Sequence, residues 1–345
     1  MTRATDQRLL APPLREGDCI GYFSPSSPAT HFAPTRYSRA RKYLESQGFR
    51  LVSGSLSGKS DHYRSGSIRA RADELNTLIR NPEVRCIIST IGGSNSNALL
   101  PYLDYDALVT DPKIIVGFSD VTSILLGIHS MTGLVTFYGP AVVASFGELP
   151  PLVDRTYETF AAMVMADARN EHFFETPEFW TDEFIDWETQ SRPKQLRPNA
   201  WEFMGDGKVR GRLIGGNLNT MWSIWGSPYM PHIESGDILL IEDSLKSIAQ
   251  VERLFAFLKI NGVFERVSGV LLGKHEGFND AGTGRQPIDV LLEVLDRETV
   301  PIVNGFDACH THPMLTVPLG VDMEIDFDHG TVQAIGPWLQ PCFMT

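Results

Sequence analysis

The sequence has few cysteines, no excess of basic charge and no long apolar run. Its four cysteines are scattered without C-x-x-C spacing (Cys19, Cys86, Cys309 and Cys342). This spacing excludes a cysteine-rich zinc site and fits reduced thiols in a cytoplasmic protein. Asp and Glu outnumber Lys and Arg by 42 to 30, which gives a net charge of −12. Nucleic acid is not expected as a partner, because phosphate binding needs a basic surface.

Signals for targeting and for common cofactor sites are also missing. Residues 1–15 are polar and contain proline, so we expect no signal peptide, and no apolar segment is long enough to span a bilayer. The glycines do not form the G-x-G-x-x-G dinucleotide fingerprint, and the H-E-x-x-H zinc motif does not occur. These absences predict a protein that has no cofactor and no membrane association.

The first half of the chain alternates between strand-like apolar runs and segments with helical spacing. Strands are expected at 18–24, 49–52, 84–90 and 114–116, with helices at 35–47, 68–79 and from 121 onward. This alternation predicts an α/β fold with an open, mostly parallel sheet and helices on both faces. We expect an N-terminal domain at 1–165, an aromatic-rich linker over the cleft at 166–207 and a C-terminal domain at 208–345.

Ser119 follows the β-branched run at 114–116 and precedes a helix-like segment. Gly117 permits a sharp turn, so the Ser119 hydroxyl is expected at a strand-to-helix corner beside free amide groups. The pattern is close to the G-x-S-x-G elbow of hydrolases, although Asp120 and Val121 follow the serine. The alternative is that Ser119 or Asp120 only caps the helix.

The Gly92-Gly93 pair follows the strand expected at 84–90. A plain tight turn is one interpretation. The other is that an amide of this turn forms an oxyanion hole with the amide of Asp120, because glycine has no Cβ to block a substrate.

A serine nucleophile needs a base, and the base needs a group that orients it. His310 and His312 follow an expected strand in a loop that ends at Pro313, and Glu242 is a carboxylate at another strand end. Ser119, Glu242 and His310 therefore form a candidate triad. The competing interpretation is a divalent metal site built from both histidines with one of three further residues (Asp307, Glu242 or His275), which would leave the Ser119 corner without a role.

An aromatic-rich, irregular segment follows at 172–203 (Phe173, Phe174, Phe179, Trp180, Phe184, Trp187 and Trp201). Its rings are expected either to wedge between the domains or to stack on a flat ligand such as a nucleobase.

Four ordered motifs resemble the LD-carboxypeptidase family of serine peptidases. They are Val-Gly-Phe-Ser-Asp (116–120), Gly-Gly-Asn-Leu (215–218), Leu-Ile-Glu-Asp (240–243) and His-Thr-His-Pro (310–313). The resemblance runs from about residue 17 to 330, and the stretches at 91–102, 173–187, 241–253 and 273–276 resemble the microcin C self-immunity branch. Cys309 departs from the glycine usual before this histidine in murein-directed members, which argues against a wall-peptide substrate.

The resemblance implies a role for each matching position. Ser119 would be the nucleophile, Glu242 the orienting acid and His310 the base, with the oxyanion hole formed by the amides of Gly93 and Asp120. Substrate contacts would come from Asn217, Lys274, Trp180 and Trp187, the two tryptophans lying around a nucleotide base. It also implies a Rossmann-like first domain, a smaller swivelling β/α second domain and a cytoplasmic homodimer without metal or cofactor.

Three functions are therefore considered. The first is a serine carboxypeptidase or amidase that cleaves an amide C-terminal to an acidic aminoacyl group of a small peptide or an aminoacyl-nucleotide. The resemblance implies a microcin C-type aminoacyl-nucleotide as the substrate and a role in self-immunity or detoxification. The second is an LD-carboxypeptidase that acts on murein tetrapeptides. The third is a binding module that is not catalytic.

Overall fold

The first half of the chain forms a six-stranded sheet in the order β14-β5-β4-β3-β1-β2. The computed structural model describes residues 8–165, 171–296 and 299–341. Five strands pair in parallel: β1 (Cys19–Phe23), β2 (Arg50–Ser53), β3 (Val84–Ser89), β4 (Ile114–Gly117) and β5 (Thr136–Tyr138). The predicted mostly parallel sheet is confirmed. An antiparallel edge strand, β14 (Val317–Leu319), joins it from the far end of the chain.

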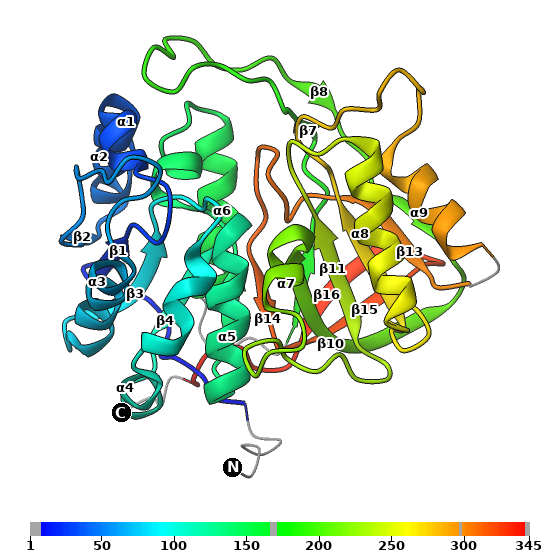
Figure 1. The fold of residues 1–345 in the computed structure, drawn as a ribbon, viewed down its shortest axis with the longest axis horizontal. Helices are drawn as coiled ribbons and strands as arrows, with labels where there is room; N and C mark the ends of the chain where they lie inside the picture. The colour runs from blue at the N-terminus through cyan, green and yellow to red at the C-terminus, as the bar shows by residue number, and fades with distance from the viewer. Residues whose placement is uncertain (1–7, 166–170, 297–298, 342–345) are drawn as a thin grey trace.

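Helices surround this sheet (Figure 1). They are α1 (Ala29–Phe32), α2 (Pro34–Ser46), α3 (Ile68–Arg80), α4 (Tyr105–Thr110), α5 (Thr122–Thr132) and α6 (Leu152–Val164), with short turns η1 (Ser96–Tyr102), η2 (Ser119–Val121) and η3 (Val142–Phe146). Local signals set several helix ends. Ser67 accepts a hydrogen bond from the Ala70 amide (3.2 Å) where α3 begins, and α5 stops at Gly133, whose φ is 74°.

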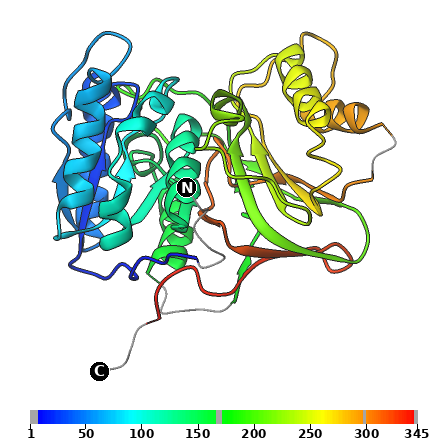
Figure 2. The ribbon, with the colours of Figure 1, turned by 60° about the horizontal axis from the view of Figure 1, so that its bottom comes forward.

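The second half forms an eight-stranded mixed sheet in the order β6-β16-β15-β10-β11-β12-β13-β9. Its centre is parallel: β10 (Lys208–Asn217), β11 (Ile238–Glu242), β12 (Gly269–Gly273) and β13 (Ile302–Phe306). Antiparallel strands flank it: β15 (Asp322–Asp326), β16 (Thr331–Ile335), β6 (Glu171–Phe174) and β9 (Glu202–Met204). The helices are α7 (Leu218–Ile224), α8 (Ile248–Ile260) and α9 (Pro287–Leu295). Figure 2 shows the two sheets in separate halves that lie side by side.

The aromatic segment contains more regular structure than its sequence suggests. Besides β6 and β9, it holds the two-residue strands β7 (Phe179–Trp180) and β8 (Arg197–Pro198), which pair with each other. In Figure 1 the green chain between them reaches across the top of the molecule toward the first half. The domain boundaries at 165 and 207 stay a prediction, and β14 lies in the first sheet although it belongs to the range 208–345.

No helix in the described part of the chain is both long and apolar enough to cross a membrane. Cys19, Cys86 and Cys309 are buried free thiols, and Cys342 lies outside the described residues.

Candidate active site

Three sequence-predicted residues lie at the carboxyl ends of strands from both sheets. Ser119 comes two residues after β4, Glu242 is the last residue of β11, and His310 follows β13. In open α/β sheets, this edge is where ligands bind. Hydrogen bonds described below connect the two edges, so the site is assembled between the two halves of the chain.

Ser119 adopts a left-handed backbone conformation with φ of 61°, which is uncommon for a residue other than glycine. The turn η2 and then α5 begin at this point, so the chain changes from strand to helix within a few residues. Such strain, about 1–3 kcal/mol, is typical of functional corners. Neither Ser119 nor Asp120 caps these turns with its side chain, so the simple helix-cap interpretation is not supported.

Glu242 and His310 form a tight pair. Nδ1 of His310 lies 2.5 Å from Oε2 of Glu242, and the second carboxylate oxygen accepts hydrogen bonds from the Tyr138 hydroxyl (2.7 Å) and the Asn217 amide (3.0 Å). Glu242 is fully buried, and the His310 side chain is 10% exposed. This arrangement fixes the imidazole so that its other nitrogen remains available to act as a base.

Each member of the pair shifts the pKa of the other. Burial would raise the pKa of Glu242, but the charge and hydrogen bond of His310 outweigh it and hold that pKa below its usual range. Burial would lower the pKa of His310, and Glu242 reverses this effect, so the His310 pKa lies above 6.5. The pair therefore favours an ionised carboxylate.

Ser119 is connected to this pair indirectly. Its backbone N–H donates to the Tyr138 hydroxyl (3.3 Å), which in turn donates to Glu242, and the ring of the preceding Phe118 packs edge-on against His310 at 4.9 Å between centroids. Among the described residues, no hydrogen bond joins the Ser119 hydroxyl to His310. Contacts of this kind often form only when substrate is bound.

The glycine turn lies directly against Ser119. A Cβ added at Gly92 would lie 2.8 Å from Cβ and 2.9 Å from Oγ of Ser119, and 3.0 Å from the Asp120 amide nitrogen. At Gly93, whose φ is 149°, an added Cβ would instead lie 2.2 Å from Oγ of Ser26. Within the described parts of the chain, the backbone amides of Gly93 and Asp120 donate no backbone hydrogen bond, and an oxyanion hole formed by both stays a prediction.

The Asp120 carboxylate braces this arrangement. It accepts hydrogen bonds from the amides of Asn95 (3.0 Å) and Ser96 (2.9 Å), which follow the glycine turn. Burial raises the pKa of Asp120, and these hydrogen bonds oppose the rise. The side chain therefore holds the turn after β3 against the corner after β4, next to the proposed oxyanion site.

The side chains of Asn217 and Lys274 both form hydrogen bonds with other groups of the protein. The Asn217 side chain donates to Glu242 and Asp243 (3.2 Å) and accepts from Thr220 (3.0 Å) at the start of α7. The Lys274 ammonium donates to Asp307 (2.6 Å) and to the carbonyl of Gly305. Asn217 thus orients Glu242, and direct substrate contacts by both residues stay a prediction.

The two tryptophans lie against different halves of the chain. The Lys274 ammonium lies 5.5 Å, and the Arg197 guanidinium 5.2 Å, from the centre of the Trp180 ring. Trp187 packs on the first half, with its ring 6.1 Å from that of Phe32. The Arg36 guanidinium lies 4.8 Å from the Trp187 ring centre. A shared nucleobase site therefore stays a prediction.

The metal alternative finds no suitable ligand set. Among the described residues, no group of three His, Cys, Asp or Glu side chains is placed to hold a metal ion. Asp307 binds Lys274, Asn199 and Trp201 instead. His312 is buried, and its pKa is held well below 6.5, first by burial and then by the charge of Lys194.

Models of known families match both halves of the sequence. The LD-carboxypeptidase N-terminal domain matches residues 20–139, and the LD-carboxypeptidase C-terminal domain matches residues 210–325. The chain belongs to the LD-carboxypeptidase family. It is a serine-type carboxypeptidase, a hydrolase, as its sequence motifs predict.

Similar proteins cover almost the whole chain of this LD-carboxypeptidase family member. A Vibrio cholerae protein named as a carboxypeptidase is 63% identical over 96% of this chain and 99% of its own length. The microcin C7 self-immunity protein of Escherichia coli is 55% identical over 96% of this chain and 97% of its own length. Its solved complex with aspartyl sulfamoyl adenosine matches with a TM-score of 0.95, covering 96% of this chain and 100% of that one. The murein tetrapeptide carboxypeptidase of Pseudomonas aeruginosa is 27% identical over 66% of this chain and 67% of its own length.

The sequence does not point to Tyr138 in this LD-carboxypeptidase site, and it does not show which glycine of the Gly92-Gly93 pair faces Ser119; Glu276 is marked only by the motif at 273–276. Tyr138 ends a buried strand of three residues, where an aromatic side chain is expected to belong to the hydrophobic core. Burial raises the pKa of Glu276, which the charges of His310 and Lys194 oppose. A perturbed carboxylate beside a candidate base is a signal that only the fold reveals.

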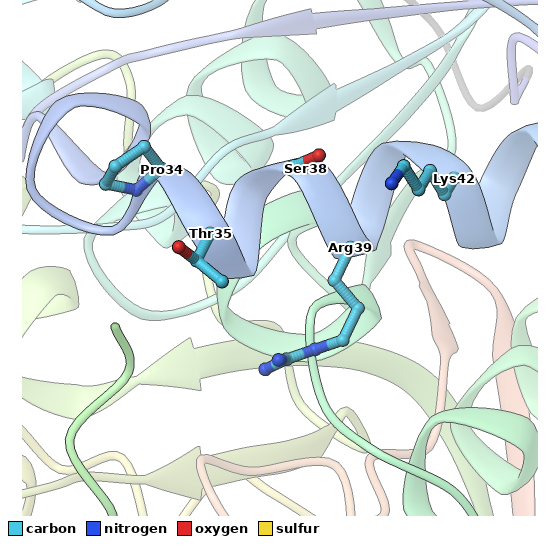
Figure 3. A pocket seen from close by; sticks show the side chains of 5 residues that line it. All are labelled: Pro34, Thr35, Ser38, Arg39 and Lys42. Carbon is cyan, nitrogen blue, oxygen red and sulfur yellow. The ribbon is translucent and has the colours of Figure 1, made fainter. Parts of the chain in front are cut away.

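A surface hollow of about 550 Å³ lies on the outer side of α2 (Figure 3). Its lining comes from that one helix (Pro34, Thr35, Ser38, Arg39 and Lys42). Because the candidate triad and its neighbours do not line it, we place the chemistry of this LD-carboxypeptidase family member elsewhere.

Proposed function

We propose that this carboxypeptidase hydrolyses the amide bond C-terminal to an acidic aminoacyl group by a Ser119–Glu242–His310 triad, with aminoacyl-nucleotides as substrates. The observation that carries the chemistry is the link from the strained Ser119 through Tyr138 to the 2.5 Å His310–Glu242 pair. A strained serine, a base and a buried orienting carboxylate are the parts that acyl transfer needs.

In the proposed mechanism, the Ser119 hydroxyl oxygen attacks the aminoacyl carbonyl carbon while His310 takes the hydroxyl proton. The oxyanion that forms is bound by the amides of Gly93 and Asp120. His310 then gives its proton to the leaving nitrogen, and the C–N bond breaks to leave an acyl ester on Ser119. Water, deprotonated by His310, attacks this ester, which releases the amino acid and restores the serine.

The substrate class is supported by similarity to the microcin C7 self-immunity protein, which was solved with aspartyl sulfamoyl adenosine and with glutamyl sulfamoyl guanosine. In both compounds, an acidic aminoacyl carbonyl is bonded to the nitrogen of a sulfamoyl nucleoside. Trp180 supports a nucleobase site, because the adjacent Thr181 pairs through its backbone with His312, two residues beyond the proposed base. This pairing brings an aromatic surface near the catalytic loop.

Murein tetrapeptides are the second candidate, favoured by the similarity to the murein enzyme but at lower identity and coverage. One experiment separates the two: incubation of the protein with aspartyl sulfamoyl adenosine and, separately, with a murein tetrapeptide, followed by mass analysis of the products. We expect free aspartate and sulfamoyl adenosine from the first. Release of the terminal residue from the tetrapeptide alone would contradict the proposal.

The pH dependence of the reaction reports the state of His310. Its pKa is raised above 6.5 by Glu242, against the effect of burial, and only the neutral imidazole accepts the serine proton. We therefore expect kcat/KM to fall on acidification with a midpoint above pH 6.5, by about ten-fold per pH unit below it. A rate that stays flat between mildly acidic and neutral pH, with chemistry limiting, would argue against His310 as the base.

Replacement of Trp180 by alanine tests the nucleobase site. A stacked ring contributes about 1–3 kcal/mol per base. We therefore expect Trp180→Ala to raise KM for aspartyl sulfamoyl adenosine about ten-fold, while a substrate that lacks the base changes little. Phe184→Ala is the matched control from the same segment, because this ring is 82% exposed and should affect neither substrate. Equal losses for both substrates in Trp180→Ala would assign the ring a structural role.

We also propose that the enzyme acts in the cytoplasm as a homodimer. The family resemblance supports this, and the buried free thiols among the described cysteines are compatible with a reducing compartment. Light scattering should give twice the chain mass of 38.4 kDa, and a monomer at micromolar concentration would contradict the homodimer.

A further inference from the structure

Both backbone polar groups of Ser119 are held by hydroxyl groups. The Ser119 N–H donates to the Tyr138 hydroxyl at 3.3 Å, and the Thr122 hydroxyl donates to the Ser119 carbonyl at 2.6 Å. Tyr138 ends β5 and Thr122 begins α5, so both partners belong to the first half of the chain. The nucleophile candidate is therefore fixed on both sides of its α-carbon.

The same two hydroxyls continue into the second sheet. The Tyr138 hydroxyl donates to Oε1 of Glu242 at 2.7 Å, and the Asn217 backbone N–H donates to the Thr122 hydroxyl at 3.1 Å. The Asn217 side-chain amide then donates to Oε1 of Glu242 at 3.0 Å. These five residues form a closed ring of hydrogen bonds, which we call the interdomain ring (Ser119, Tyr138, Glu242, Asn217 and Thr122).

The donor directions in the interdomain ring are fixed by chemistry. Because the Ser119 amide can only donate, the Tyr138 hydroxyl must accept from it and give its single proton to Glu242. Glu242 accepts from Tyr138, Asn217 and the ring and backbone nitrogens of His310, which suits an ionised carboxylate. Burial raises the pKa of Tyr138 well above 10, so the hydroxyl keeps its proton.

Four of the five residues of the interdomain ring are buried and closely packed. Tyr138, Thr122 and Glu242 are fully buried, and Asn217 is 4% exposed. A Cβ at Gly216, whose φ is 141°, would lie 2.8 Å from Cγ2 of Thr122 and 2.9 Å from the Tyr138 ring. Only glycine allows β10 to come this close, so a missing hydroxyl would leave buried partners unsatisfied.

We propose that Tyr138 is a positioning residue for the hydrolysis, an inference that rests on the proposed function. Its hydroxyl holds the Ser119 backbone and the Glu242 carboxylate in register across the boundary between the two sheets. It also occupies the Ser119 amide, so that oxyanion binding is left to the amides of Gly93 and Asp120. Small changes in the relative position of reacting groups have large effects on rate, which is why such a connection matters.

The test is Tyr138→Phe, which keeps the ring and removes only the hydroxyl. We expect kcat for aspartyl sulfamoyl adenosine to fall about 10- to 30-fold with KM within about two-fold, because an interaction used in the transition state is lost. Glu242 loses one donor and becomes more basic toward His310, so the acidic limb of the pH profile should move to higher pH. Glu276 and Asp243, the other carboxylates that raise the His310 pKa, are unchanged.

Tyr22→Phe is the matched control. Tyr22 is a fully buried tyrosine in β1 of the same sheet, and its hydroxyl bonds Tyr37 and Ser53 away from the site. Removal of the Tyr22 hydroxyl in Tyr22→Phe should lower the melting temperature and leave kcat and the pH profile unchanged. If Tyr138→Phe behaves like Tyr22→Phe, the proposal is wrong.

Two further measurements keep the proposal testable. If Tyr138→Phe does not fold, Thr122→Val is the second variant, because it removes the other hydroxyl group of the interdomain ring. An unchanged kcat in folded Thr122→Val would overturn the proposal. The proton between His310 and Glu242 should give a low-field NMR signal that moves in Tyr138→Phe and not in Tyr22→Phe. This signal needs no substrate, so an unmoved signal refutes the positioning role, whereas absent turnover in the wild-type protein refutes the proposed function.

Discussion

Replacing Ser119 by alanine should lower kcat for aspartyl sulfamoyl adenosine by about 10⁴-fold or more, because the proposed nucleophile is lost. The fold should remain intact. The serine hydroxyl has no hydrogen-bond partner among the described residues, and the side chain is only half-buried at its corner. Steady-state kinetics, together with the melting temperature, measures both effects.

Ser130→Ala is the control for this experiment. Ser130 lies on α5, the helix that follows Ser119, and its hydroxyl donates to the carbonyl of Pro228 at 2.8 Å. We expect wild-type kcat in this variant. If Ser119→Ala kept its activity, the proposed triad would be excluded. If the unaltered protein bound the ligand without any turnover, the non-catalytic binding module would gain support.

Gly92→Ala should lower kcat by about 10²- to 10³-fold, as much as the loss of one oxyanion donor, because its methyl group would obstruct the proposed oxyanion site. The added methyl group would lie within 3.0 Å of Ser119 Cβ, Ser119 Oγ and the Asp120 amide, where the substrate oxygen must bind. Gly92 is not among the residues with positive φ, so its backbone accepts alanine without strain. Because these contacts are closer than a Cβ normally makes, the corner must shift slightly, so we expect a modest fall in the melting temperature beside the large loss of kcat.

Gly66→Ala is the matched control, because the new methyl group would meet the flexible end of the Leu56 side chain at 3.1 Å and Ala70 Cβ at an ordinary contact distance of 3.7 Å. Gly93→Ala should behave differently from both. With φ of 149° and a methyl group 2.2 Å from Ser26 Oγ, it should destabilise the fold itself. Full activity in Gly92→Ala would contradict an oxyanion site at this turn.

Much of the architecture follows from local sequence patterns. The run Ile114–Val116 predicts a buried strand because β-branched side chains suit a sheet covered on both faces, and it forms β4. The strands at 171–174, 179–180, 197–198 and 202–204 were not predictable, since two to four residues carry no readable period. β14 was missed for the same reason, and its partner β5 lies about 180 residues earlier in the chain.

The candidate site was predictable to the extent that its chemistry lies at strand ends. Glu242 and His310 could be paired because carboxyl ends of parallel strands meet at one edge. Tyr138 could not be predicted, because a buried strand tyrosine is usually core and only the second sheet brings Glu242 to its hydroxyl. The Gly92-Gly93 doublet likewise does not reveal which glycine faces Ser119, since this depends on the backbone path after β3.

The most direct test of the proposed mechanism is to look for the acyl ester on Ser119. The enzyme is mixed with aspartyl sulfamoyl adenosine, quenched in acid within a fraction of a turnover, digested and analysed by mass spectrometry. We predict an added aspartyl group on the peptide that contains Ser119, and none in Ser119→Ala. Rapid turnover in both proteins with no adduct on this peptide would contradict the central claim.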